Sequence, residues 1–134
     1  MASALKSHDK VHIYIRSVLR PSDITVEFFK AKKLDKISNV IGGITNGNVI
    51  MERHLISAVE LLCADKVKVF PVMLKDLYES DVLQEDAILE WAAEGRSEFT
   101  LEEVDEETRA ILRAEAEPLV SWLQDDSDSD SNDE

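Results

Sequence analysis

Acidic and aromatic residues are interleaved in two stretches of this 134-residue sequence, residues 77–91 and 116–126. Carboxylates attract ammonium groups, and aromatic rings can receive a cation on their faces or pack against the methylene stem of a lysine. The side chains with this capacity are three aromatic residues and eight acids: Tyr78, Glu79, Asp81, Glu85, Asp86, Glu90, Trp91, Glu117, Trp122, Asp125 and Asp126. Together they predict a surface that binds lysine-rich polypeptide segments.

The charge of the chain is divided unevenly between its two parts. Residues 1–75 contain twelve Lys/Arg and seven Asp/Glu, whereas residues 76–134 contain three Lys/Arg and twenty-one Asp/Glu. Such asymmetry is informative about binding partners. The acidic part repels nucleic acid and attracts basic polypeptides, so we expect no direct nucleic-acid contact through it.

The number of acids matters because single ion pairs are weak. One exposed Lys–Asp pair contributes about 0.2–1 kcal/mol, whereas micromolar binding requires roughly 8 kcal/mol. Many simultaneous pairs are therefore needed, and the field of the acidic part steers a lysine block toward them. Because the Debye length is about 8 Å at physiological ionic strength, this binding should weaken strongly with salt.

The same side chains also have structural interpretations. Trp91 and Trp122 each end an apolar helical pattern, so core packing is the expected role of both rings, and contact with a partner at the rim is the alternative. The role of Tyr78 stays open, because acids flank it. The acids could form an ordinary solvated helix face, but the one-sided charge favours a binding role.

Other reactive residue types do not form a catalytic or metal-binding set. Cys63 lies in the apolar run 61–64, which predicts a buried structural thiol. His8 and His12 have helical spacing, but no ligand-type glutamate lies between them, and His54 is distant in sequence. Since no nucleophile or phosphate-binding loop is present either, we expect no enzyme activity, no metal and no cofactor.

Two further features could bind or modify partners. Lys30, Lys32, Lys33 and Lys36 could form a basic contact face, with a plain solvated face as the alternative. In the tail, Ser127 and Ser131 each have an acid three residues downstream, as acid-directed kinases prefer. Phosphate would add about −1.5 to −2 charge at each serine and should tighten a lysine-rich partner. The tail could also be merely solubilising.

Helical spacing recurs along the chain and must position these residues. In the first part of the chain, the expected segments are residues 11–19, a helix opening at Ser22 or Asp23, residues 34–44 with an interruption at Gly42-Gly43, and residues 49–64. The second part should contain residues 71–78 and a helix that is capped by Asp81 with Gln84 and ends near Glu94. A long helix capped by Thr100 with Glu103 then runs through Arg113, and a last turn or two follows Pro118 at residues 119–123. Short connections between them predict an all-α fold, a HEAT-like stack of antiparallel helical hairpins with six to eight helices.

The chain divides into one domain and two ends. We expect a flexible N-terminus at residues 1–7, a domain at residues 8–124 and a disordered acidic tail at residues 125–134, which contains no apolar residue. No secretory or membrane-spanning pattern is present, and a single cysteine suits a reducing compartment. These features favour a cytoplasmic monomer.

The two acidic stretches resemble the aromatic/acidic boxes of the two-tryptophan domain that closes eukaryotic translation initiation factor 5. The same domain closes the epsilon subunit of the guanine-nucleotide exchange factor for initiation factor 2. Residues 77–91 resemble the first box closely, and the second box is similar through Trp122-Leu123, after which Asp and Ser replace the family's glutamate run. Residues 109–122 are more similar to factor 5 than to the exchange-factor subunit.

This resemblance implies an adaptor in translation initiation. In the family, the boxes bind lysine-rich blocks of the initiation factor 2 beta subunit, and the domain contacts initiation factors 3 and 1 to assemble a multifactor complex. The GTPase-activating domain of factor 5 lies outside the stretch of resemblance. The alternatives are the catalytic C-terminal domain of the exchange-factor subunit and an acidic chaperone that binds basic proteins without selectivity.

Overall fold

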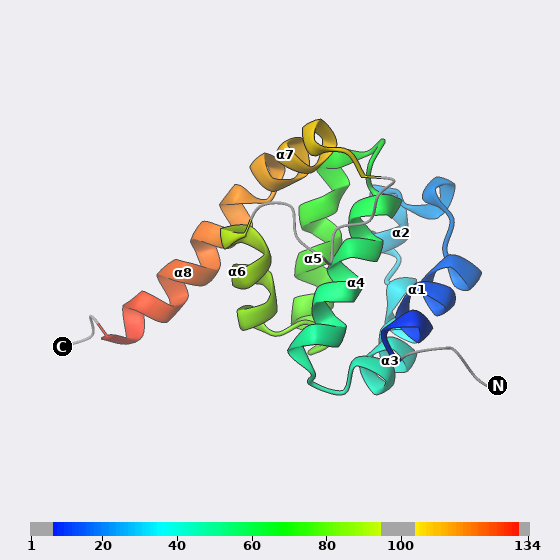
Figure 1. Ribbon diagram of the computed structural model, residues 1–134, viewed down its shortest axis with the longest axis horizontal. Helices are drawn as coiled ribbons and strands as arrows, with labels where there is room; N and C mark the ends of the chain where they lie inside the picture. The colour runs from blue at the N-terminus through cyan, green and yellow to red at the C-terminus, as the bar shows by residue number, and fades with distance from the viewer. Residues whose placement is uncertain (1–6, 95–103, 132–134) are drawn as a thin grey trace.

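The computed structural model describes residues 7–94 and 104–131, which fold entirely into helices and their connections (Figure 1). Within these ranges the elements are α1 (Ser7–Val18), η1 (Pro21–Asp23, a 3-10 turn), α2 (Val26–Lys30), α3 (Leu34–Thr45), α4 (Val49–Leu62), η2 (Val67–Val69, a 3-10 turn), α5 (Phe70–Glu79), α6 (Glu85–Ala93), α7 (Glu106–Glu115) and α8 (Glu117–Ser131). This confirms the predicted all-α class.

Side-chain caps explain where several of these helices begin. The side chain of Asn48 accepts a hydrogen bond from the backbone N–H of Met51 at the start of α4 (3.2 Å). Asp105 accepts one from the N–H of Thr108 at the start of α7 (2.8 Å). Each cap satisfies a backbone donor that has no partner within its helix. In α5 a proline occupies the first turn, where its missing N–H leaves no bond unmade.

The helix boundaries differ from the sequence-based predictions at several points. Helix α2 opens after its cap residue Thr25, and not at Ser22 or Asp23. Those two residues lie in the 3-10 turn η1, where the carboxylate of Asp23 accepts from Arg20 N–H (3.0 Å). Asp81 does not cap α6: it lies in a turn with φ of 66°, and Gln84 takes the cap position. The predicted cap at residues 100–103 lies outside the described residues.

Helix α3 also differs, because it continues through Gly42 and Gly43 without interruption. It ends at Asn46, which adopts a left-handed conformation with φ of 48°. Gly47 follows with φ of 74°, a conformation that glycine adopts without steric cost. The predicted Asn-Gly turn is therefore present, and it lies at the C-terminal end of an unbroken helix.

Helix α4 forms the centre of the core. Figure 1 shows α4 and α5 in the middle of the molecule, with α1 to α3 on one side and α6 to α8 on the other. The fully buried side chains include Leu55, Phe70 and Ile88. Cys63 is completely buried, and burial raises the pKa of its thiol to about 12. This confirms the structural thiol that the sequence predicts.

The C-terminal helix α8 begins in the packed domain and continues into the acidic tail. Leu119, Val120 and Leu123 are buried and attach the first two turns of α8 to the domain. Its backbone then continues as helix to Ser131, past the boundary expected at residue 124, and its last turns extend away from the other helices (Figure 1). Helix propagation beyond a packed turn adds one hydrogen bond for each residue ordered. Disorder of this segment in solution stays a prediction.

Candidate functional site

A tight turn between α5 and α6 presents the first acidic stretch. The backbone N–H groups of Val82 and Leu83 both donate to the carbonyl oxygen of Leu77 (2.9 and 3.2 Å). The side chains of these three residues are buried, which fixes the turn to the core. Asp81 accepts the left-handed backbone conformation that the turn requires. The apolar residues of the box thus hold its polar residues toward solvent.

The polar residues of this turn surround a hollow of about 410 Å³. Glu79 and Asp81 are exposed, and Glu85 and Tyr78 are half-buried. The lining consists of Tyr78, Glu79, Asp81, Leu83, Gln84 and Glu85. Four of the predicted binding residues are therefore brought together, with three carboxylates and one aromatic ring around a single concave surface. Asp86 lies beside it, in the exposed first turn of α6.

A buried glutamate that the sequence analysis did not single out supports this turn from beneath. Glu52 of α4 is fully buried, and its Oε1 accepts a hydrogen bond from the backbone N–H of Gln84 (2.8 Å). Among residues 7–94 and 104–131, its other oxygen, Oε2, has no hydrogen-bond partner. Burial raises the pKa of Glu52; the Gln84 hydrogen bond acts in the opposite direction, and the charge of Asp86 adds to the rise. An acid within a largely apolar helix was the available signal.

Trp91 lies beneath the site as part of the core. Its ring is only 3% exposed, and its Nε1–H donates to Oε2 of Glu60 (2.8 Å). The guanidinium of Arg109 lies over the ring, 5.1 Å from its centre, and forms an ion pair with Glu60 (3.7 Å). This is the core role expected for Trp91, and it leaves the ring little surface for direct contact with a partner.

Two of the predicted acids have partners inside the domain. Glu90 forms an ion pair with the buried Arg53 (3.3 Å), which also binds the carboxylate of Glu94. Glu117 accepts hydrogen bonds from Arg113 Nη1 (2.6 Å) and from the hydroxyl of Ser121, and these bonds lower the pKa of Glu117. Both acids therefore contribute less charge to an incoming ligand than the exposed Glu79 and Asp81 of the turn.

The second aromatic/acidic stretch meets the first through its tryptophan. Trp122 is 41% exposed, so the core packing expected for this ring is wrong. Its ring meets Tyr78 edge to face, with 5.9 Å between the ring centres, and the ammonium group of Lys75 lies 5.2 Å from its centre. A hollow of about 310 Å³ beside it is lined by Pro71, Val72, Lys75, Pro118, Leu119 and Trp122. The two stretches thus form one continuous surface.

The remaining predicted residues are placed as follows. Asp125 is exposed near the end of the packed part of α8. The side chains of Asp126, Ser127 and Ser131 lie outside those that the structure describes. The lysines proposed as a basic face are all exposed around α2 and α3: Lys30, Lys32, Lys33 and Lys36. Nothing in their geometry distinguishes a contact face from a solvated one.

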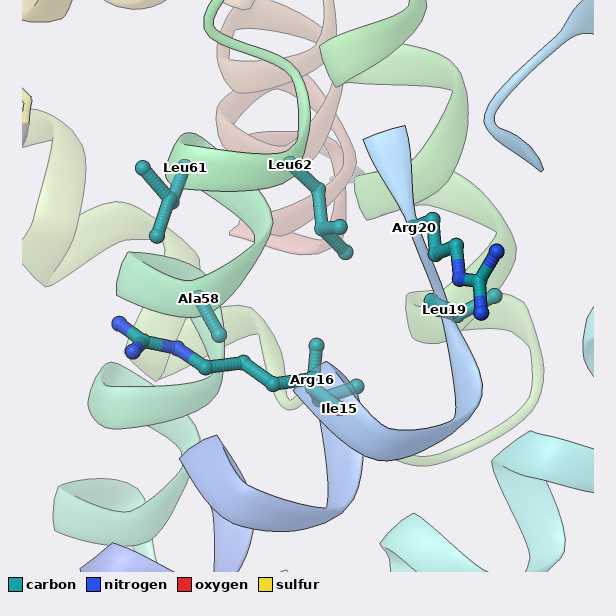
Figure 2. Close-up of a pocket in the computed structure, with 7 residues that line it drawn as sticks. All are labelled: Ile15, Arg16, Leu19, Arg20, Ala58, Leu61 and Leu62. Atoms are coloured by element: carbon teal, nitrogen blue, oxygen red, sulfur yellow. The ribbon is translucent and has the colours of Figure 1, made fainter. Parts of the chain in front are cut away.

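A further hollow of about 300 Å³ lies between α1 and α4, on a different pair of helices from the acidic surface. Figure 2 shows its apolar lining and the two arginine side chains, which extend to opposite sides of it. Its lining residues are Ile15, Arg16, Leu19, Arg20, Ala58, Leu61 and Leu62. This hollow contains no acid, so it takes no part in the acidic surface. Nothing here indicates what would occupy it.

Two of the histidines contact each other but form no metal-binding cluster among the described residues. His12 and His54 contact each other between α1 and α4, with 3.4 Å between ring nitrogens. In the part of the chain that the structure describes, no three residues of metal-binding type come together. No helix among residues 7–94 and 104–131 is both long and apolar enough to cross a membrane.

Comparison with known proteins places this geometry in a family. The sequence model of the W2 family, described as eIF4-gamma/eIF5/eIF2-epsilon, matches residues 51–133. The chain belongs to the W2 family. This match covers both aromatic/acidic stretches and all but the first two residues of α4, the helix that supports them. The family assignment therefore includes the whole of the surface described above.

Individual relatives point to one branch of the W2 family. Eukaryotic translation initiation factor 5 from Mus musculus is 26% identical over 83 residues, which is 59% of this chain and 18% of that protein. The Rattus norvegicus and Pongo abelii proteins give the same values. The chain thus spans about a fifth of these relatives.

A solved structure titled "The C-terminal Domain of Translation Initiation Factor 5 at low pH" has the same fold. Its TM-score with this chain is 0.65 at 13% identity, with 98% of this chain and 99% of that one covered. At this identity the likeness concerns the fold alone. Together with the sequence relatives, it confirms the similarity to the C-terminal W2 domain of factor 5 that the boxes indicate.

Proposed function

We propose that this W2 domain is a translation initiation adaptor that binds lysine-rich protein segments. The observation that carries the proposal is the single surface formed by the acidic hollow of Tyr78, Glu79, Asp81 and Glu85 together with the exposed ring of Trp122. A lysine segment can place its ammonium groups among the carboxylates and its stems against the rings. The domain contributes binding and performs no chemistry.

The strength and selectivity of this binding come from different residues. Glu79, Asp81 and Asp86 are exposed and form no ion pair within the described residues, so a partner's lysines can reach them. Each such pair contributes about 0.2–1 kcal/mol, so several must form at once. Tyr78 and Trp122 add aromatic surface that a merely acidic chain lacks. This distinguishes the proposal from an unselective acidic chaperone.

The resemblance to factor 5 suggests the identity of the partners. We propose the lysine-rich blocks of the initiation factor 2 beta subunit as the ligand of the acidic surface. Initiation factors 3 and 1 are the proposed further contacts, within a cytoplasmic multifactor complex in which this domain is monomeric. Because the sequence relatives and the solved structure are all factor 5, we prefer this role to that of the exchange-factor epsilon subunit. A guanine-nucleotide exchange assay tests this preference. We expect the domain not to stimulate GDP release, and stimulated release would favour the exchange-factor subunit.

The test is calorimetric titration with a peptide that carries a block of lysines, at two salt concentrations. We expect binding that weakens strongly at the higher concentration, as screened ion pairs do. The double variant Glu79→Lys/Asp81→Lys should lose most of the affinity. The matched control is Glu106→Lys/Glu107→Lys, which changes the net charge equally on the exposed first turn of α7. Equal losses in both variants would show that net charge, and not this surface, determines binding.

A further inference from the structure

Lys75 is a cation that lies beside an exposed aromatic ring on the surface that carries the acidic hollow. It projects from α5 one turn before Tyr78, and its ammonium group lies 5.2 Å from the centre of the Trp122 ring. This is the distance of a cation–π interaction. Within the described residues no carboxylate forms an ion pair with Lys75, so the ring is the partner that the structure gives to its charge.

The ring that receives Lys75 belongs to the same surface as the acids. The hollow beside Trp122 shares Val72 and Lys75 with a second hollow of about 260 Å³, and that hollow contains Glu79. Glu79 in turn lines the acidic hollow of the α5–α6 turn. A segment lying along the exposed face of α5 would therefore pass from the carboxylates to the indole without leaving the depression.

We propose that the Trp122 ring is a cation subsite of this surface, and that Lys75 occupies it until an ammonium group of a lysine-rich partner takes its place. The inference rests on the proposed function, since it assigns one more position of the same surface. The incoming group has the same chemistry as the group that it displaces. Trp122 is 41% exposed, so the ring is within reach of solvent and of a partner.

An internal competitor of this kind lowers affinity and sharpens selectivity. A single lysine gains little by replacing Lys75, whereas a block of lysines, held at the carboxylates by its other charges, presents an ammonium group to the ring at high effective concentration. Isolated surface lysines of other proteins are thereby disfavoured. The cost of displacing Lys75 from an exposed ring corresponds to a factor of about 2 to 5 in affinity.

The test compares substitutions of Lys75 in calorimetric titrations with a nine-lysine peptide at constant ionic strength. Lys75→Met removes the competing charge and keeps an apolar stem against the ring. Lys32→Met is the control, because it removes the same charge from the lining of the neighbouring hollow. Within the described residues the ammonium group of Lys32 contacts no aromatic ring. We expect Lys75→Met to bind about 2- to 5-fold more tightly than Lys32→Met.

Two further variants make the result decisive. Lys75→Arg, whose planar guanidinium stacks better on an indole, should bind the peptide more weakly than wild type. In a Trp122→Leu background the advantage of Lys75→Met should disappear. Equal affinities of Lys75→Met and Lys32→Met, or an advantage that persists without the indole, would overturn the inference while wild-type binding to the acidic hollow stands. A wild type that does not bind the peptide at all would remove the proposed function as well.

Discussion

Tyr78 and Trp122, one from each aromatic/acidic box, pack edge to face, with an angle of 86° between their ring planes and 5.9 Å between the ring centres. Tyr78 lies in the last turn of α5 and Trp122 lies in α8, so two segments far apart in sequence form one binding surface. Edge-to-face pairs of this kind are a favourable arrangement of aromatic rings. The acids of the first box thereby gain an aromatic neighbour from the second.

The ring pair should be energetically coupled. We expect Tyr78→Ala and Trp122→Ala each to lower the free energy of unfolding, with a coupling of about 0.5–1.5 kcal/mol between them in a double-mutant cycle. The measurement is urea unfolding of wild type, both single variants and the double variant. Strictly additive effects would mean that the two boxes are stabilised independently.

The buried pair of Glu60 and Arg109 should be essential to the position of Trp91. Arg109→Met removes the ion pair that Arg109 forms with the buried Glu60 carboxylate, and we expect a loss of about 3–5 kcal/mol in the free energy of unfolding. The double variant Glu60→Gln/Arg109→Met removes both charges and should recover a large part of that loss. Chemical denaturation measures both variants, and a double variant less stable than Arg109→Met would argue against a charge-pair role.

Glu52 should make stability depend on pH in a direction opposite to most carboxylates. Burial raises the folded-state pKa of Glu52 above its unfolded value, so folding takes up a proton in the interval between the two values. Its contribution to stability is therefore fully present below the unfolded pKa and is lost as the pH rises through the folded pKa. At neutral pH, above the unfolded pKa, burial of Glu52 therefore lowers the free energy of unfolding.

The variant Glu52→Gln tests this sign. Glutamine keeps an oxygen that can accept from Gln84 N–H and carries no charge. We expect a higher melting temperature than wild type at pH 7, with the difference shrinking as the pH falls through the folded pKa of Glu52 and absent below the unfolded value of about 4.5. Thermal unfolding across this pH range measures it. A variant less stable than wild type at pH 7, with no trend toward acid, would contradict the proposed cost of the charge.

Phosphorylation of the tail should strengthen binding to a lysine segment. Phosphate at Ser127 or Ser131 adds about −1.5 to −2 charge each to the negative field of the second half. We expect a domain treated with an acid-directed kinase to bind the lysine peptide more tightly, mostly through a faster association rate. The matched control replaces both serines by alanine before the same treatment, and unchanged affinity of the phosphorylated sample would refute the hypothesis.

The helical architecture was predictable from sequence because its signals are local. The apolar periodicity around Leu55 and the position of Pro71 at a helix start both depend on neighbouring residues alone. Some boundaries were wrong for the same reason. Ser22 has the chemistry of a cap, but it lies inside the 3-10 turn η1, where the carboxylate of Asp23 accepts from Arg20 N–H. Local sequence rules do not predict which of two possible capping residues will precede the helix.

The composition of the candidate site was also predictable, but its arrangement was not. The acids around Tyr78 are contiguous in sequence, so the turn brings them together by itself. The exposure of Trp122, the support by Glu52 and the contact of Lys75 depend on how α8 and α4 pack against the α5–α6 hairpin. Of these, Glu52 leaves a compositional signal, as an acid within a largely apolar helix, whereas the contacts of Trp122 and Lys75 leave none.

The central claim, that carboxylates and an exposed indole on one surface capture lysine-rich segments, is tested most directly by NMR titration of the isotopically labelled domain. On addition of a lysine-block peptide at low salt, we predict the largest shifts at the backbone amides of residues 78–86 and at the indole N–H of Trp122. The indole N–H of Trp91, bonded to Glu60, should move little. Shifts confined to α1–α3, or no shifts at all, would contradict the account.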